Sequence, residues 1–170
     1  MKELILGGAR SGKSRLAEQR AGAIGQDVLY IATAQAYDDE MNERIARHQN
    51  DRPAHWSTLE EPLYLARALK DNAKEGRVIL VDCLTLWLSN LLCMDDSSFF
   101  ETQKESLLEC YRLLPGQVIL VSNEVGQGIV PDNALARRFI DEAGWLHQAL
   151  AAQSDQVTFV TAGIAQQLKP

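Results

Sequence analysis

Residues 7–14 have the types and the spacing that hold a nucleoside triphosphate. They run Gly-Gly-Ala-Arg-Ser-Gly-Lys-Ser and fit the pattern G-x-x-x-x-G-K-[ST]. Glycines adopt backbone conformations that side chains resist, so successive N–H groups can turn toward phosphate oxygens. Lys13 would place its charge on the β- and γ-phosphates, and Ser14 would ligate Mg²⁺ at a helix N-terminus with partial positive charge. We expect the nucleotide to contact Gly7, Gly8, Ala9, Arg10, Ser11, Gly12, Lys13 and Ser14.

Two carboxylates follow apolar runs further along the chain. Residues 78–82 form an apolar run that ends in Asp82, which is expected to hold Mg²⁺ directly or through water, as the metal-binding acid of many nucleotide sites does. A second run, residues 118–122, leads to Glu124. In open α/β sheets the ligand lies beyond the carboxyl ends of the strands. Glu124 is therefore expected to act as a base or a metal-linked carboxylate, with a structural loop residue as the alternative.

His48 lies in a polar segment between the second apolar run and residue 60. At 100° per residue, Met41, Ile45 and His48 share one helix face, and Arg44 would lie one turn before His48, where it could contact a phosphate. Taken alone, this spacing favours His48 as a partly buried residue at the end of an apolar stripe. A chemical role for the imidazole stays open at this point.

The elements that must position these residues alternate between short apolar runs and helical patterns, which is typical of a parallel α/β sheet. Strands rich in Val, Ile and Leu are predicted at residues 3–6, 28–33, 78–82, 118–122 and 157–161. Helices are predicted at residues 14–23, 39–50 and 60–73, and a last one begins after Asp132 as its N-cap, with Leu135, Phe139, Leu146 and Leu150 on one face. No repeat or linker interrupts the chain. Residues 1–170 are predicted to form a single domain with a P-loop NTPase fold of the RecA-like kind, a mostly parallel sheet flanked by helices.

Composition excludes several classes of protein. The 170 residues are 46% hydrophobic and 24% charged, and the formal net charge of −6 argues against a nucleic-acid or anionic-membrane partner. Cys83, Cys93 and Cys110 lack the spacing of a zinc site and suit a reducing compartment. No run approaches 18 apolar residues, so no transmembrane segment is expected. These features predict a cytoplasmic protein.

Five blocks of sequence resemble one known family. They are GGARSGKS (7–14), YIATAQ (30–35), DDEM (38–41), RIARHQNDRPAHW (44–56) and NEVGQGIVP (123–131). In this order, and over nearly the whole chain, they resemble the bifunctional adenosylcobinamide kinase / adenosylcobinamide-phosphate guanylyltransferase of cobalamin (vitamin B12) biosynthesis. Many families share the loop, whereas the histidine block and the NEVG block are much more specific.

The resemblance implies two successive transfers on one substrate. ATP or GTP first phosphorylates the aminopropanol hydroxyl of adenosylcobinamide. A histidine then takes GMP from GTP, releases pyrophosphate and passes GMP on, which gives adenosylcobinamide-GDP. His48 matches this nucleophile; a neutral imidazole nitrogen can attack the α-phosphorus and form a labile phosphoramidate. His48 and Lys13 are therefore the expected catalytic residues, with Mg²⁺ bound by Ser14 and Asp82.

The resemblance also implies nucleotide contacts beyond the loop, at Ala32, Thr33, Ala34, Gln49, Asn50, Asp51, Arg52, Glu60 and Asp82. Some members of the family carry two adjacent histidines where this chain has Arg47 and His48. His55 is expected to have a structural or guanine-side role. His147 is expected to serve packing or to lie on the surface.

Partners and assembly follow from the same resemblance. The expected partners are the small molecules adenosylcobinamide, ATP and GTP, and the chain is expected to form a homotrimer. Four apolar side chains would suit a core as well as a subunit interface, namely Trp87, Leu88, Leu91 and Leu92.

Two other functions fit part of the sequence. One is a P-loop kinase of another small metabolite, in which His48 is structural. The other is a nucleotide-dependent switch protein such as a small GTPase. The chain has no N-K-x-D motif to recognise guanine, which counts against the switch protein.

Overall fold

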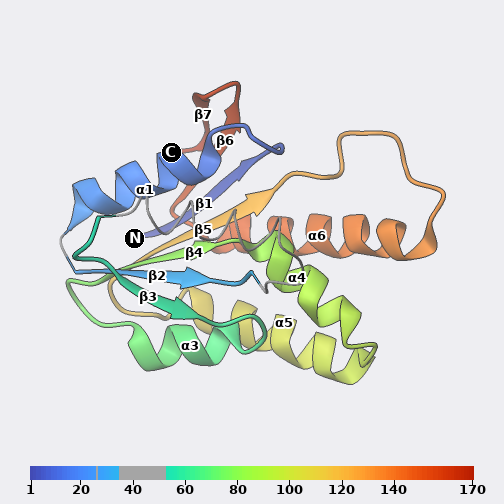
Figure 1. Ribbon diagram of the computed structural model, residues 1–170, viewed down its shortest axis with the longest axis horizontal. Coiled ribbons are helices and arrows are strands. Elements are labelled where there is room, and N and C mark those ends of the chain that lie inside the picture. Colours follow the sequence, from blue (N-terminus) through green and yellow to red (C-terminus); the bar gives the residue numbers. More distant parts are fainter. Residues whose placement is uncertain (26, 35–52) are drawn as a thin grey trace.

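The computed structural model describes residues 1–25, 27–34 and 53–170 (Figure 1). In these residues one seven-stranded sheet has the order β3-β2-β4-β5-β1-β6-β7. Neighbouring strands are parallel, except for the antiparallel pair β6 and β7 at one edge. The strands are β1 (Lys2–Gly7), β2 (Val28–Ala32), β3 (Ser57–Glu60), β4 (Val78–Asp82), β5 (Gln117–Asn123), β6 (Gln156–Thr161) and β7 (Ile164–Lys169).

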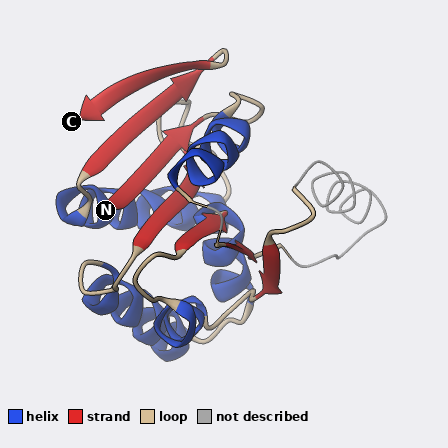
Figure 2. Ribbon diagram, turned by 90° about the vertical axis from the view of Figure 1, so that its left-hand side faces the viewer, coloured by secondary structure: helices blue, strands red, loops and turns tan. Residues whose placement is uncertain are grey.

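Helices cover both faces of the sheet, as Figures 1 and 2 show from two directions. Alternate strand residues point to opposite faces: Leu4 and Leu6 of β1 pack into one apolar cluster, and Ile5 packs into the other. The first cluster includes residues of α3, α4, α5 and α6, and the second includes residues of α1. The helices are α1 (Lys13–Ile24), α3 (Leu65–Asn72), α4 (Leu84–Cys93), α5 (Ser97–Tyr111) and α6 (Ala134–Gln153).

The five predicted strands are confirmed, and each of their ends agrees to within one residue. Two further strands were not predicted. β3 is four residues long with mostly exposed side chains, and β7 is exposed along nearly its whole length, so neither shows the apolar run of a buried strand. Glu60 was expected to begin a helix; this is wrong, because it ends β3 and α3 begins at Leu65.

The helical predictions need similar corrections. The helix predicted at residues 39–50 lies outside the described residues. α4 and α5 were not predicted; α4 buries most of its length and therefore lacks the polar face that reveals a surface helix. The last helix is confirmed, but its N-cap is Asn133, whose side chain accepts a hydrogen bond from Ala136 N at 3.0 Å, and not Asp132.

The apolar side chains of α4 belong to the core. Trp87, Leu88 and Leu91 are fully buried and Leu92 is nearly so. The indole of Trp87 donates a hydrogen bond to the carbonyl of Leu63 at 2.9 Å, which satisfies its one polar atom. Within this chain the four residues are therefore core residues. None of the helices in the described part of the chain combines the length and apolarity that crossing a bilayer needs.

A buried ion pair joins α1 to the middle of the sheet. The Glu3 carboxylate is fully buried and accepts hydrogen bonds from the Arg20 guanidinium and the Thr158 hydroxyl. Arg20 also donates to the Thr158 hydroxyl at 2.8 Å. A charge buried this deeply needs its partner, because without it the carboxylate loses the hydration it had in the unfolded chain.

Arg20→Ala is therefore expected to lower the free energy of unfolding by about 3 kcal/mol, as removal of one partner of a buried ion pair does. The double variant Arg20→Met/Glu3→Leu is expected to regain most of this loss. Chemical denaturation of both variants tests the prediction, with Arg67→Ala as control because Arg67 and Asp71 form an exposed pair on α3. Equal losses in the single and double variants would contradict it.

Candidate functional site

The predicted site residues that the structure describes lie along one edge of the sheet. Because strands β1 to β5 run in the same direction, their carboxyl ends all lie at the right-hand side of Figure 1. In register, Gly7 lies beside Asn123, and Ala32 lies beside both Glu60 and Asp82. Ligands of open parallel sheets bind at this edge.

The phosphate loop connects β1 to α1. Arg10 and Gly12 have positive φ values of 55° and 95°, and Ser11 N donates to Gly8 O at 3.3 Å, which closes the turn. The Lys13 side chain is buried and bends back over the loop, where its Nζ donates to Gly8 O at 3.1 Å. The ammonium group is therefore held at the loop itself.

The turn between β6 and β7 braces the phosphate loop. Gly163 N donates to Ser11 O at 2.8 Å. A peptide unit is planar and trans, so the Gly12 N–H points away from the hairpin. A Cβ on Gly12 would lie 3.2 Å from Gly163 Cα, and a Cβ on Gly7 would lie 2.5 Å from Val160 O. The sequence pattern needs glycine at both positions because backbone packs directly against backbone.

Ser14 and Asp82 carry oxygen donors of the kind that Mg²⁺ binds. Ser14 lies in the first turn of α1 and Asp82 ends β4, and both are half-buried. Burial raises the pKa of the neighbouring Cys83 thiol to about 11; the Asp82 carboxylate adds to this shift and the Lys13 ammonium opposes it. A hydroxyl and a carboxylate are hard donors that Mg²⁺ takes together with phosphates and water. The described residues contain no cluster of three or more His, Cys, Asp or Glu that would hold a metal alone.

The segment after β2 packs against the end of β4. The buried Thr33 hydroxyl donates to Cys83 O at 2.6 Å and accepts from Cys83 N at 2.9 Å. Asn90 of α4 donates to Thr33 O at 2.8 Å. The Thr33 side chain therefore faces the protein, whereas Ala32 and Ala34 are half-buried beside it. Asn90 was not among the predicted site residues, and it lies in a helix that was not predicted.

Glu60 is exposed at the far end of the same edge. Four strand spacings separate β3 from β1, roughly 19 Å at about 4.8 Å each. A ligand with its phosphates on the loop would meet Glu60 only through a remote part. Asp82 is two strands from β1, roughly 10 Å, because β5 lies between β4 and β1.

Several predicted residues lie outside the described part of the chain, namely His48, Gln49, Asn50, Asp51 and Arg52. His55 is exposed and precedes β3, so it lies toward the amino ends of the strands, at the edge opposite the loop. The neighbouring Trp56 is buried against α1, where a Cβ on Gly22 would lie 3.6 Å from its ring. This placement favours a structural role for His55.

A buried polar group that was not predicted from the sequence lies behind the end of β5. His147 of α6 is 6% exposed, and its Nε2 lies 2.8 Å from the Ser122 hydroxyl. Its Nδ1 lies 3.9 Å from Glu124 Oε2. Burial lowers the pKa of His147 and the Glu124 carboxylate opposes this shift. The prediction for His147 holds for packing and fails for the surface. The available signal was a histidine on the apolar face of a helix and a serine near the end of a buried strand.

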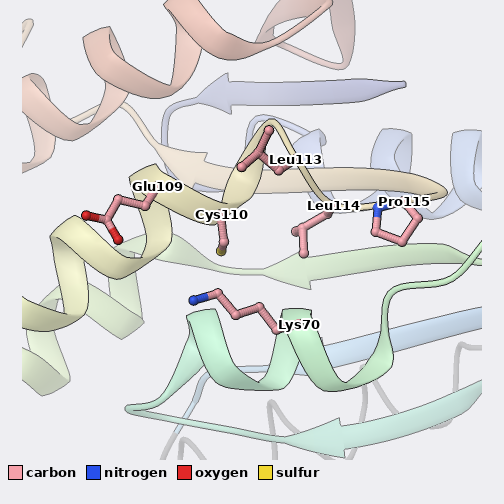
Figure 3. A pocket seen from close by; sticks show the side chains of 6 residues that line it. All are labelled: Lys70, Glu109, Cys110, Leu113, Leu114 and Pro115. Carbon is pink, nitrogen blue, oxygen red and sulfur yellow. The ribbon is translucent and has the colours of Figure 1, made fainter.

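Two hollows in the surface lie away from the loop. The larger, ≈ 420 Å³, lies between α3 and the end of α5, near the amino end of β5 (Figure 3). It is lined by Lys70, Glu109, Cys110, Leu113, Leu114 and Pro115. The second, ≈ 300 Å³, lies between α4 and α6. Neither contains a residue of the phosphate loop.

Solved structures with the same architecture are distant in sequence. An ATPase from the type III secretion system of pathogenic bacteria superimposes with a TM-score of 0.54 at 16% identity, covering 94% of this chain and 51% of that one. A protein from Pyrococcus horikoshii OT3 gives a TM-score of 0.58 at 10% identity, covering 99% and 85%. These similarities concern the fold alone. They confirm the predicted P-loop NTPase fold with its mostly parallel sheet.

Relatives of known sequence are much closer. The bifunctional adenosylcobalamin biosynthesis protein CobP of Pseudomonas aeruginosa is 60% identical over 169 residues, covering 99% of this chain and 98% of the relative. The corresponding protein CobU of Escherichia coli is 41% identical over 184 aligned residues, covering 99% and 100%. The family model described as cobinamide kinase / cobinamide phosphate guanyltransferase matches residues 3–168. The family predicted from the motifs is thereby confirmed, and the chain belongs to the cobinamide kinase / cobinamide phosphate guanylyltransferase family.

Proposed function

We propose that this chain phosphorylates adenosylcobinamide with ATP or GTP and then transfers GMP from GTP to the product through a GMP–histidine intermediate. The observation that carries the proposal is the braced phosphate loop with its buried Lys13, in a chain that matches the family from residue 3 to residue 168. One sheet contains strands from both ends of the chain, which supports a single kinase/guanylyltransferase domain over residues 1–170.

Phosphorylation would use the loop and two carboxylates, Asp82 at the end of β4 and Glu124 after β5. The Lys13 ammonium and the loop N–H groups would neutralise charge on the β- and γ-phosphates as the transferred group moves. Glu124 would take the proton of the acceptor hydroxyl, because its main-chain N–H is bonded to Gly7 O at 3.0 Å and its side chain is partly exposed. Mg²⁺ would supply further positive charge at the phosphates, held by Ser14 and Asp82.

Guanylyl transfer would proceed by two displacements at the α-phosphorus. A neutral nitrogen of His48 attacks it, and the bond to the β-phosphate oxygen breaks as pyrophosphate leaves. A phosphate oxygen of the phosphorylated substrate then attacks the same phosphorus, and the N–P bond breaks to regenerate the imidazole. The proposed nucleotide contacts outside the loop are Ala32, Thr33, Ala34, Gln49, Asn50, Asp51, Arg52, Glu60 and Asp82. For Thr33 the contact would come from the main chain, since its side chain is engaged by Cys83.

The second candidate is a kinase of another small metabolite in which His48 has no chemical role. The two candidate functions differ in one chemical intermediate. Only the bifunctional enzyme forms a covalent GMP adduct when GTP is present and the acceptor is withheld.

His48→Ala is expected to abolish guanylyl transfer and to leave phosphorylation of adenosylcobinamide measurable, because the γ-phosphorus does not need the imidazole. Lys13→Ala is expected to lower both rates by about 10²-fold or more, since both reactions use the triphosphate on the loop. The measurement is incubation with GTP labelled at the α-phosphate, denaturation in alkali, which preserves phosphoramidates, and intact-mass analysis. His55→Ala is the matched control and should label like the parent protein. Equal labelling of His48→Ala and the parent would end the covalent mechanism.

Asp82→Asn is expected to raise the Mg²⁺ concentration that gives half the maximal phosphorylation rate by roughly tenfold, because a neutral amide binds the ion less strongly than a carboxylate. Titration of MgCl₂ at fixed ATP measures it. Asp71→Asn on the exposed side of α3 is the control and should titrate like the parent. An Asp82→Asn titration that overlays the parent curve would remove Asp82 from the metal site.

The last part of the proposal is that the protein self-associates in the cytoplasm. The resemblance implies a trimer. Ile129 and Val130, in the loop after β5, are 98% and 69% exposed, and Leu135 at the start of α6 is 54% exposed. Large contiguous apolar patches often mark subunit contacts, and these three residues are candidates for such a patch. Three unpaired cysteines suit a reducing compartment. Light scattering is expected to give a multiple of the chain mass of 18.9 kDa, and the mass of a monomer would contradict the oligomer.

A further inference from the structure

A network of polar groups lies behind the carboxyl end of β5. Asn123 N donates to Thr85 Oγ1 at 2.7 Å, and Thr85 Oγ1 lies 3.3 Å from Ser122 Oγ. Ser122 Oγ lies 2.8 Å from His147 Nε2, and His147 Nδ1 lies 3.9 Å from Glu124 Oε2. Residues of α4, β5 and α6 contribute to this network.

With Glu124 ionised, the following assignment of hydrogen atoms suits this network. Glu124 is an acceptor when ionised, so the imidazole nitrogen that faces it is best occupied by an N–H. Nε2 is then the acceptor, and the Ser122 hydroxyl donates to it. Because the Ser122 hydroxyl donates its hydrogen bond to His147, its oxygen accepts from the Thr85 hydroxyl. The Thr85 oxygen in turn accepts from Asn123 N–H. Each donor in this network thus meets an acceptor, except the Nδ1–H of His147, which faces Glu124 across a gap.

Glu124 lies at the boundary between this buried network and the candidate phosphate site. Its main-chain N–H is bonded to Gly7 O at 3.0 Å, and its Oε1 accepts from Gly126 N at 2.6 Å. Oε2 is the oxygen that faces His147, and the side chain is 22% exposed whereas that of His147 is 7% exposed. The carboxylate is therefore tied to the main chain through Oε1, whereas Oε2 faces His147 and can contact a ligand at the loop.

We propose that His147 is a positioning residue for phosphoryl transfer: in the reacting complex its Nδ1–H donates to the Glu124 carboxylate and holds it in place to take the proton of the acceptor hydroxyl. The inference rests on the proposed function, because it concerns the kinase step of that site. In this step the hydroxyl oxygen forms a bond to the γ-phosphorus and its proton passes to Glu124. The bond from the γ-phosphorus to the β-phosphate oxygen breaks, and the nucleoside diphosphate leaves with the electron pair.

The gap of 3.9 Å is longer than a hydrogen bond, and a shift of about 1 Å would close it. Catalytic hydrogen bonds are often long in proteins without substrate and shorten in the reacting complex. Glu124 is free to make this shift because it follows the last residue of β5, whereas His147 is fixed in the middle of α6 and by Ser122. The proposal therefore expects Glu124 to move toward His147.

Two replacements of His147 separate the roles of its two nitrogens. The amide of asparagine lies where Nδ1 was, so His147→Asn keeps a donor toward Glu124 and loses the contact with Ser122. The amide of glutamine reaches to where Nε2 was, so His147→Gln keeps the contact with Ser122 and loses the donor toward Glu124. A purely structural histidine would favour glutamine, and a positioning histidine would favour asparagine.

The experiment measures kcat and KM for phosphorylation of adenosylcobinamide by ATP, together with covalent labelling by GTP, in both variants. His147→Gln is expected to lower kcat about tenfold or more, a part of the factor of about 10²–10⁴ that a general base contributes. The KM for ATP and the labelling by GTP should stay close to the parent values, since neither needs an acceptor hydroxyl. His147→Asn should be at least about fivefold faster than His147→Gln, as rescue by the variant that keeps the donor.

A double-mutant cycle keeps the proposal testable if a His147 variant is less stable than the parent. Glu124→Gln removes the base and should itself lower kcat by about 10²-fold or more. His147→Gln added to Glu124→Gln should cause no further loss, because His147 acts through Glu124. Additive losses, equal rates for the two His147 variants, or a faster His147→Gln would overturn the inference. A parent protein that does not phosphorylate adenosylcobinamide would overturn the proposed function as well, which distinguishes the two failures.

Discussion

The phosphate loop depends on the hydrogen bond from Gly163 N to Ser11 O, which joins a turn near the end of the chain to a loop near its start. Backbone approaches this close are possible because Gly7 and Gly12 carry no Cβ. The bond fixes the Ser11–Gly12 peptide, and with it the direction of the Gly12 N–H. The hairpin of β6 and β7 therefore has a structural role, although β7 is exposed along nearly its whole length and adds little to the core. Its turn supports the part of the protein that would bind phosphate.

The second constraint is the position of β5 between β1 and β4. It keeps Asp82 two strands away from the loop and places the residues that follow β5 between the two. Glu124 therefore lies between a cationic loop and an anionic strand end, with its main chain tied to Gly7. The same strand presents Ser122 to α6 on the face opposite α1. The strand order thus brings the proposed base, Glu124, and its proposed support, His147, to one place, although the two residues are far apart in sequence.

The sequence was sufficient for features that depend on local backbone chemistry. The loop at residues 7–14, the buried strands and the position of Asp82 follow from glycine spacing and apolar runs, and the structure confirms their arrangement at one edge of the sheet. Elements without such a pattern were missed: β3 is short and polar, and α4 is apolar on most of its surface. The pairing of His147 with Ser122 was invisible for another reason, since it joins residues 25 positions apart through packing of a helix on a sheet. Periodicity finds the faces of elements, whereas contacts between elements need the three-dimensional structure.

The two proposed reactions act on different phosphorus atoms of a triphosphate, and the described residues contain one phosphate loop. The edge from β1 to β3 spans roughly 19 Å, which gives room for the phosphates at one end and for a remote part of the ligand near Glu60. Because Lys13 and the loop N–H groups would hold the β- and γ-phosphates in both reactions, the two triphosphates of a full cycle would have to occupy the loop in turn. The γ-phosphorus would lie next to Glu124, and the α-phosphorus would lie further from the loop. A base on the strand beside the loop and a nucleophile that comes from another part of the chain are therefore what one loop needs to perform both transfers.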